Sequence, residues 1–555
     1  MPRTGGQILI DQLLINGVER AFCVPGESYL AALDALYEAR NRIELIVCRQ
    51  EGGAAYMAEA DGKMTGRPGI CFATRGPGAT NASVGVHVAL QDSTPMILFV
   101  GDVAREQRDR EAFQEVDFGK MFAPLAKWVV RIDEAARIPE LVSQAFHRAM
   151  SGRPGPVVVV LPEDMLTETV DTADAGAATA VQAHPAPETM QRLRAMIEKS
   201  ERPFMIVGGG TWNEQATKDI AAFAEAMDLP TGASFRCQSY FDNDHKLYAG
   251  DVGIGVNPKL AERIRDTDLL IAAGARLGEM TTSGYTLVTP PVPKQTLVHI
   301  HPGAEELGRV YQPTLAINSG MAEFCAAARA LKPVDAAVVS GARRSWTESA
   351  RAEYLAWTKE VQCVGPIQMA EVVRTIREAT PPDTMICNGA GNFSAWFHVF
   401  HRYCFYRAQL APTNGSMGYG VPAAVAAKLR YPERVVIAAA GDGDFLMNGQ
   451  EFATAVQHGA NIIVLVVNNG MYGTIRMHQE RDYPGRVVGT DLRNPDFAAY
   501  ARAFGGHGET VRTTAEFRPA LERAMAAGKP AIIELPIDPE ALTIRRTLSE
   551  IRGAR

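Results

Sequence analysis

The sequence lacks the patterns that mark several classes of protein. Its eight cysteines include no Cys-x-x-Cys pair, which argues against a zinc site and indicates reduced thiols packed among apolar residues. No apolar run reaches the ~18 residues of a membrane-spanning helix, and a helical pattern begins almost at once, without a signal-peptide apolar segment. The chain is therefore expected in the cytoplasm, with no membrane partner.

Positive charge is also scarce. The 555 residues include 56 Lys and Arg against 63 Asp and Glu, for a net charge of −7. Such a chain cannot neutralise many phosphates, so no nucleic-acid partner is expected. Apolar residues make up 46% and charged residues 21%, as in ordinary globular proteins, and the length suggests about three domains.

An amphipathic helix, a short apolar strand and a glycine-rich loop follow one another three times. The expected helix and strand pairs are 6–16 with 21–24, 190–199 with 204–207, and 366–379 with 384–387. Alternation of this kind builds parallel sheets. The predicted fold class is α/β, with three consecutive parallel-sheet α/β domains.

Composition indicates where these domains end. A stretch rich in Ala, Thr, Asp and Pro follows an apolar strand at 157–161, and a second transition precedes Gly365-Pro366. The predicted segments are a first domain at 1–165, a linker at 166–190, a middle domain at 191–335, a linker at 336–365, a third domain at 366–545 and a C-terminal tail at 546–555.

The strongest local signal lies between residues 434 and 474. An apolar strand at 434–440 runs into Gly441-Asp442-Gly443-Asp444, a helix is expected at 448–458, and an apolar strand at 462–467 ends in Asn468-Asn469-Gly470-Met471. A strand–helix–strand crossover brings both strand ends to one edge of the sheet, so Asp442 and Asn469 are expected to meet there. A carboxylate, an amide oxygen and a backbone carbonyl suit Mg²⁺, and Gly441 and Gly443 let the backbone approach a phosphate. Either loop alone is equally consistent with a simple turn.

These residues resemble the GDG…NN motif of thiamine diphosphate enzymes. The likeness extends over nearly the whole chain and is closest to acetolactate (acetohydroxyacid) synthases and related decarboxylases and carboligases. Family members carry a pyrimidine-binding, a middle and a diphosphate-binding domain, in that order. The resemblance implies that Asp442, Asn469 and the main-chain oxygen of Met471 bind Mg²⁺. It also implies a diphosphate site lined by Gly391, Asn392, Phe393, Gly443, Asp444, Tyr472, Gly473 and Thr474.

Residues 47–60 resemble the strand and helix that carry the family's catalytic glutamate, here Glu51. In the family this carboxyl group hydrogen-bonds the aminopyrimidine ring of the cofactor and promotes loss of the thiazolium proton. Without the resemblance, a glutamate at a helix N-terminus would simply complement the helix dipole. The family often has His before this glutamate, where this chain has Gln50.

Two further loops complete the implied cofactor site. Residues 72–81 resemble the family's GPG loop, so Pro25 and Asn81 are expected on the pyrimidine side. Residues 413–420 resemble the segment that bends the cofactor, with Met417 between its two rings and the Gly415 carbonyl accepting from its amino group.

The substrate side is less sharply defined. Residues 112–117 resemble the acetolactate synthase stretch whose glutamine faces the reacting carbon, so Gln114 is a candidate to position a substrate carbonyl, with a surface-loop glutamine as the alternative. Arg75 replaces a small family residue and either reaches an anionic substrate or lies at an interface. His87 is either a satisfied helix histidine or a proton donor. The chain has no His-His pair of the pyruvate decarboxylase type, and Thr74 stands where the benzoylformate type has histidine.

The middle domain contains no GxGxxG fingerprint. Its loops at 206–210, 250–255, 274–278 and 299–302 resemble the FAD-binding loops of acetolactate synthases. Some relatives bind ADP there and others bind no nucleotide, so FAD is one of three open alternatives.

The predicted function is that of a thiamine diphosphate- and Mg²⁺-dependent enzyme of the acetolactate synthase type. It would decarboxylate a 2-oxo acid and join the resulting carbanion to a second carbonyl. The alternatives are a simple decarboxylase of the benzoylformate type and a non-catalytic regulatory or binding protein that retains the fold, although Glu51, Asp442 and Asn469 are all present. The resemblance also implies a homodimer or homotetramer with active sites between subunits.

Overall fold

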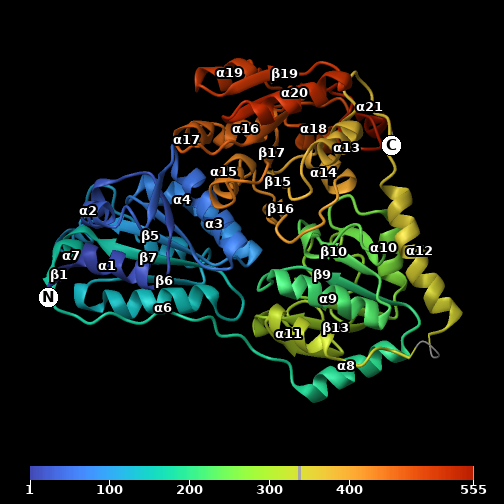
Figure 1. Ribbon diagram of the computed structural model, residues 1–555, viewed down its shortest axis with the longest axis horizontal. Helices are drawn as coiled ribbons and strands as arrows, with labels where there is room; N and C mark the ends of the chain where they lie inside the picture. The colour runs from blue at the N-terminus through green and yellow to red at the C-terminus, as the bar shows by residue number, and fades with distance from the viewer. Residues whose placement is uncertain (336–338, 554–555) are drawn as a thin grey trace.

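The computed structural model describes residues 1–335 and 339–553 of the chain. It contains three six-stranded sheets, each with parallel neighbouring strands, and one short antiparallel pair, β1 (Arg3–Thr4) with β8 (Thr169–Val170). Figure 1 shows the N-terminal domain in blue and cyan, the middle domain in green and yellow, and the C-terminal domain in orange and red. The predicted α/β fold with three parallel-sheet domains is confirmed.

The N-terminal and C-terminal sheets share one strand order, and the middle sheet has a different one. The N-terminal sheet runs β3 (Glu44–Val47), β2 (Arg20–Cys23), β4 (Gly69–Ala73), β5 (Met96–Asp102), β7 (Pro156–Pro162) and β6 (Trp128–Arg131). The middle sheet runs β11 (Tyr248–Val252), β10 (Thr231–Ser234), β9 (Pro203–Val207), β12 (Leu269–Ala273), β13 (Thr296–His301) and β14 (Leu315–Asn318). The C-terminal sheet runs β16 (Gln409–Leu410), β15 (Met385–Asn388), β17 (Val436–Gly441), β18 (Ile463–Asn468), β20 (Ala531–Pro536) and β19 (His507–Thr510).

Helices cover both faces of each sheet. In the N-terminal domain, α1 (Gly5–Ile15), α2 (Leu30–Glu38) and α6 (Ile138–Met150) pack on one face. In the middle domain, α8 (Pro187–Lys199), α9 (Glu214–Met227) and α11 (Met321–Arg329) oppose α10 (Pro258–Asp266) and α12 (Gly341–Trp357). In the C-terminal domain, α13 (Met369–Ala379), α14 (Ser394–Phe400) and α20 (Thr514–Ala526) cover one face.

A single hydrophobic core joins the N-terminal and C-terminal domains. Its helices are α3 (Glu51–Thr65) and α4 (Pro77–Asp92) from the first, and α15 (Gly420–Arg430), α17 (Glu451–Gln457) and α19 (Phe497–Ala503) from the last. The helix that carries Glu51 therefore packs on α15 of the same chain.

The helix expected at 448–458 is present as α17 (Glu451–Gln457), but the sequence analysis missed a preceding helix. This helix, α16 (Asp442–Asn448), begins directly at the end of β17 and is separated from α17 by a break. Asp442 and Asp444 lie in the first turn of α16. Negative charge at this position interacts favourably with the positive end of the helix dipole and so stabilises the start of the helix. At the break, a Cβ on Gly449 would lie 2.7 Å from the ring of Phe445, so a close approach requires glycine there.

The domain boundaries derived from composition stay predictions. The stretch 166–190 contains β8 and the first residues of α8, while α12 accounts for much of 336–365. Residues 336–338 of that linker and 554–555 of the tail lie outside the described part of the chain. Among the described helices, each is too short or too polar to cross a bilayer.

Candidate active site

The two expected oxygen ligands lie at neighbouring strand ends in the C-terminal sheet. Gly441 pairs in register with Val467, so Asp442 and Asn469 emerge side by side from β17 and β18. Asp442 is buried, and burial raises its pKa, although a hydrogen bond from Asn494 opposes the shift. Asn494 Nδ2 donates to Asp442 Oδ2 at 2.7 Å and to Asn468 Oδ1 at 2.9 Å, and so holds the two loops together.

The loop that carries Met471 is braced by a second segment. Met471 forms an isolated bridge with Asp491, Leu492 N donates to Gly470 O at 2.8 Å, and Tyr472 N donates to Thr490 O at 2.8 Å. Asn469 Oδ1 accepts from Met471 N at 3.2 Å, which closes the turn. These bonds order the loop whose side-chain and main-chain oxygens are the candidate metal ligands.

A cavity of about 250 Å³ opens beside these residues. Every predicted cofactor residue of the C-terminal domain lines it: Gly391, Asn392, Phe393, Gly415, Met417, Gly441, Asp442, Gly443, Asp444, Asn469, Met471, Tyr472, Gly473 and Thr474. The rest of the lining consists of Ala390, Trp396, Val467, Ile475, Ile537, Ala541 and Leu542.

The donor set of this cavity fits a magnesium diphosphate. Asp442 offers a carboxylate, Asn469 an amide oxygen and Met471 a carbonyl, all of them hard oxygen donors of the kind that Mg²⁺ prefers. A Cβ on Gly443 would lie 2.5 Å from the ring of Tyr472, so only glycine allows this close approach of backbone and ring. Asp444 Oδ2 is buried and, among the described residues, has no hydrogen-bond partner.

Glu51 lies at the other predicted half of the site, in the N-terminal domain. It is buried at the start of α3, and Asn81 Nδ2 donates to its Oε2 at 3.0 Å. Gln50, which departs from the family pattern, caps the helix by accepting from Gly53 N at 3.1 Å. Glu51 thus lies in the first turn of the helix, a position that is also consistent with the alternative in which it only complements the helix dipole. Its other carboxylate oxygen, Oε1, lies close to Gly78 in the GPG loop.

The remaining predicted residues of this domain gather at the same sheet edge. Pro25 follows β2 and is exposed, and Asn81 is exposed on α4. Gln114 is partly exposed with φ 65°, and a Cβ on Gly76 would lie 2.7 Å from its Cβ. Pro25, Glu51 and Gln114 therefore follow the carboxyl ends of β2, β3 and β5, and Asn81 lies on the helix that follows β4.

Arg75 and His87, whose roles the sequence did not decide, both contact other side chains of the same chain. Arg75 is buried and pairs with Glu27 at 3.2 Å and Glu163 at 3.0 Å, so its charge is already balanced. His87 Nδ1 lies 3.1 Å from Asn414 Nδ2 in the loop before Gly415. Both are accounted for by contacts inside the protein.

The C-terminal segment closes one side of the cavity. Asn392 Nδ2 donates to Leu542 O at 3.1 Å, and Ala541 and Leu542 border the cavity. Beyond them, α21 (Leu548–Arg552) packs on α18 (Gly473–Asp482), where Arg552 Nη2 lies 2.7 Å from Glu480 Oε1. No motif marks this segment, because its role depends on contacts made only in the folded chain.

The docking of α21 is expected to weaken in acid. Hydrogen bonding to Arg552 lowers the pKa of Glu480 from 4.5 to about 2, and a carboxyl whose pKa falls on folding contributes stability above its unfolded pKa and loses it as pH falls toward the folded value. Amide hydrogen exchange in α21, corrected for intrinsic rates, should therefore rise between pH 5 and pH 3. Arg552→Ala should show fast exchange already at pH 7, whereas Arg481→Ala, which removes an exposed pair with Asp482, should behave like wild type. Equal exchange in the two variants would contradict the role of the Glu480 pair.

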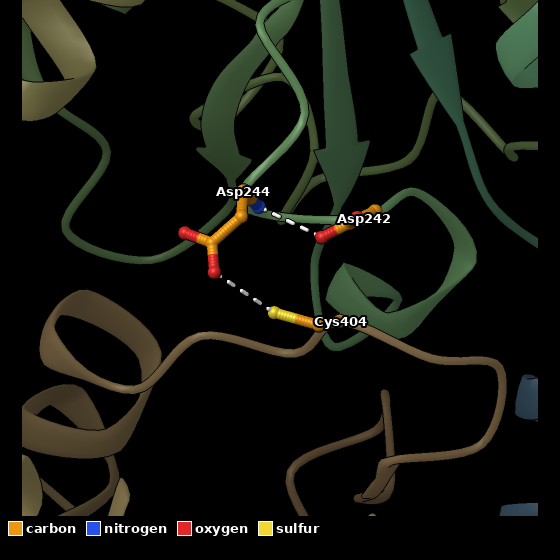
Figure 2. A group of neighbouring side chains, drawn as sticks. All are labelled: Asp242, Asp244 and Cys404. Carbon is orange, nitrogen blue, oxygen red and sulfur yellow. Dashed lines mark hydrogen bonds between the residues drawn. The ribbon is translucent and has the colours of Figure 1, made fainter. Parts of the chain in front are cut away.

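A second group of potential ligands lies between the middle and C-terminal domains. Figure 2 shows Asp242, Asp244 and Cys404, with Cys404 Sγ donating to Asp244 Oδ2 at 3.4 Å. Although Cys404 is exposed at the surface, partial desolvation and the two neighbouring carboxylates raise its pKa to about 12, whereas metal binding needs a thiolate. Arg402 also pairs with Asp244 at 3.1 Å, so the group is best explained as a contact between domains. Cys404 is exposed, contrary to the expectation that the cysteines pack in cores.

A larger cleft of about 680 Å³ lies where the three domains meet. Gly209, Ile254, Arg276 and Gly278 line it, from three of the four loops expected to bind a nucleotide. His299 and His301 do not line it but are buried, and burial lowers the pKa of His301 to about 3. Thr413, Asn414 and Gly415 form part of its wall, and Gly415 also borders the smaller cavity.

Comparisons with known proteins match all three domains of the chain. Residues 3–121 match the thiamine pyrophosphate enzyme N-terminal TPP binding domain, residues 190–328 its central domain, and residues 389–535 its C-terminal TPP binding domain. The acetolactate synthase large subunit of Parasynechococcus marenigrum is 30% identical, over 96% of this chain and 87% of the relative. The acetolactate synthase isozyme 2 large subunit of Escherichia coli is 28% identical, over 96% of this chain and 95% of the relative.

Proposed function

The chain belongs to the thiamine pyrophosphate enzymes, and on that premise we propose that it decarboxylates a 2-oxo acid and joins the product to a second carbonyl compound. The convergence of Asp442, Asn469 and Met471 on one cavity supports the cofactor site, and the likeness to acetolactate synthases supports the reaction. The three residues would hold Mg²⁺, and the surrounding loops would hold the diphosphate of thiamine diphosphate. When bound, that cofactor supplies the electron sink for decarboxylation.

The residues of the chain would orient the cofactor and move one proton. Gly415 and Met417 border the cavity, where the carbonyl of the first can accept a hydrogen bond and the side chain of the second can separate two rings. Asn81 donates a hydrogen bond to Oε2 of Glu51. Oε1 of the same carboxyl group could therefore exchange a proton with a ring nitrogen of the cofactor. Holding these groups in place lowers the entropic cost of the reaction.

We propose that each active site is shared by two subunits of a homodimer or homotetramer. Among the described residues, the cavity at Asp442 is lined only by residues of the C-terminal domain, while the hydrogen bond to Glu51 comes from Asn81 of the N-terminal domain. Apolar side chains are exposed beside both halves, including Leu30, Phe113, Met447 and Ile475. A second copy that brought the two halves together would bury them.

The cleft between the domains could hold an anionic nucleotide such as FAD or ADP. Arg276 and Arg309 line it together with Gly278, so it offers positive charge and close backbone approach. Neither nucleotide is required for the proposed reaction. The visible absorbance of the purified protein decides whether a flavin is present.

Acetolactate is the product expected from pyruvate. The purified protein should be incubated with Mg²⁺, thiamine diphosphate and pyruvate and the products identified by NMR, with Glu51→Ala as the control. Acetolactate from the wild type alone would support carboligation and the role of Glu51. Acetaldehyde would assign the protein to the simple decarboxylases, and failure to release CO₂ from pyruvate or larger 2-oxo acids would refute the proposed reaction.

A further inference from the structure

A buried arginine lies behind the cofactor cavity, at the boundary between the middle and C-terminal domains. Arg236 follows β10 with φ 61° and is 7% exposed. Its Nη1 donates to Pro412 O at 2.6 Å and its Nη2 donates to Gly389 O at 2.8 Å. One side chain of the middle domain thus holds two main-chain carbonyls of the C-terminal domain.

Both carbonyls belong to loops that form the wall of the cavity. Gly389 begins the loop 389–393 after β15, whose residues from Ala390 to Phe393 line the cavity, and Pro412 belongs to the loop 411–418 that contributes Gly415 and Met417. The two loops come from strands that pair with each other. The two loops therefore form part of the cavity wall, and their spacing affects the width of the cavity.

Asp444 ties the same two loops from the opposite side. Its Oδ1 accepts from Ala390 N at 3.0 Å and from Gly418 N at 2.8 Å. Arg236 thus fixes the loops through their carbonyls and Asp444 fixes them through their amides. Loops held from both sides have little freedom to change their separation.

Burying this guanidinium has an energetic cost. No carboxylate lies within hydrogen-bond distance of it in the described part of the chain, and its Nε has no partner. Burial lowers the pKa of Arg236 to about 10, with partial compensation by the charges of Asp92, Asp444 and Asp251. A buried cation without a paired anion is costly in a protein interior. Arg236 also borders the larger cleft, but the hydrogen bonds that it donates within the described part of the chain go to the two carbonyls of the cavity loops.

We infer that Arg236 is a positioning residue, which sets the separation of loops 389–393 and 411–418 and thereby the placement of Gly415 and Met417. That the ligand of the cavity is thiamine diphosphate rests on the proposed function. The hydrogen bonds of Arg236 to the two loops do not depend on it. A guanidinium presents a planar fork that can reach two carbonyls at once, whereas a lysine ammonium acts as a point charge. The conservative change to lysine should therefore preserve only part of the effect.

The test compares Arg236→Met and Arg236→Lys with Tyr406→Phe. Tyr406 Oη donates to Trp212 O at 2.6 Å and also joins the middle and C-terminal domains, but Tyr406 does not line the cofactor cavity. Amide hydrogen exchange in the protein without cofactor should rise in both loops for Arg236→Met, rise less for Arg236→Lys, and stay at the wild-type level for Tyr406→Phe. Unchanged exchange in both loops of the Arg236 variants would overturn the inference, whether or not the protein binds the cofactor.

Cofactor affinity gives a second readout. The Kd for thiamine diphosphate at saturating Mg²⁺, measured by quenching of tryptophan fluorescence, should rise about 10- to 100-fold in Arg236→Met, the range found when groups that orient ligating residues are removed. Tyr406→Phe should match the wild type. A wild type that binds no thiamine diphosphate would refute the proposed function, while a wild type and Arg236 variants with equal affinity would refute the role of Arg236. If Arg236→Met does not fold, Arg236→Lys carries both measurements.

Discussion

Glu51→Gln is expected to release CO₂ from its 2-oxo acid about 10²- to 10⁴-fold more slowly than the wild type, the range typical of a lost general acid–base group. Glutamine keeps the size of the side chain and can still accept the hydrogen bond that Asn81 donates at 3.0 Å. It cannot exchange a proton at neutral pH. The loss should therefore fall on kcat, measured at saturating cofactor, with little change in thermal stability.

A glutamate on β3, the strand that precedes Glu51 in the sequence, provides the control. Glu44 lies at the amino end of β3, is largely exposed and pairs with Arg20 at 2.6 Å. Glu44→Gln should keep the wild-type rate, because surface ion pairs contribute little. If Glu51→Gln also retained full activity, its carboxyl group would have no part in the chemistry.

Asp442→Asn is expected to weaken Mg²⁺-dependent binding of thiamine diphosphate at least about 100-fold, since removal of groups that only orient metal ligands costs 10- to 100-fold. Asp442 is the one charged group among the three candidate ligands, because Asn469 offers an amide oxygen and Met471 a carbonyl. Asparagine preserves the shape of the side chain but removes the negative charge. Titration of the protein with thiamine diphosphate at fixed Mg²⁺ would measure the change.

Asn494→Ala is expected to have a smaller effect on the same binding affinity than Asp442→Asn. Asn494 donates to Asp442 Oδ2 at 2.7 Å and orients it without being a ligand itself, so its loss should weaken binding by about 10-fold. Wild-type affinity in Asp442→Asn would place the metal elsewhere in the chain.

The same two variants test whether subunits share the active site. Co-expression of Glu51→Gln with Asp442→Asn yields mixed dimers in which one site of two has both residues intact, so about a quarter of wild-type activity should return in a random mixture. No recovery in verified mixed dimers would mean that each subunit builds its own complete site.

The position of the candidate metal ligands in the fold could be predicted because it depends on local rules. Parallel strands joined by a crossover end at one sheet edge, and β17 and β18 do pair in register up to Gly441 and Val467. The start of α16 could not be predicted from apolar periodicity, because its first turn is stabilised by Asp442 and Asp444 rather than by apolar contacts.

Other contributors to the site carry no local signal. Asn494 reaches Asp442 across 52 residues of sequence, Leu542 reaches Asn392 across 150, and Arg236 reaches Pro412 across 176. An asparagine, a leucine and an arginine are common in any loop. Only the folded chain shows which of them meet the cavity.

The sequence by itself determined the three α/β domains and the residues at the ends of their strands, because strand and helix alternation and glycine-rich turns are read within a few residues. Only the tertiary structure decided that α3 packs on α15 through a core shared by two domains. It also decided that the cavity at Asp442 is lined by the C-terminal domain alone among the described residues. The physical reason is that packing joins segments hundreds of residues apart, and no local pattern of side chains encodes which surfaces will meet.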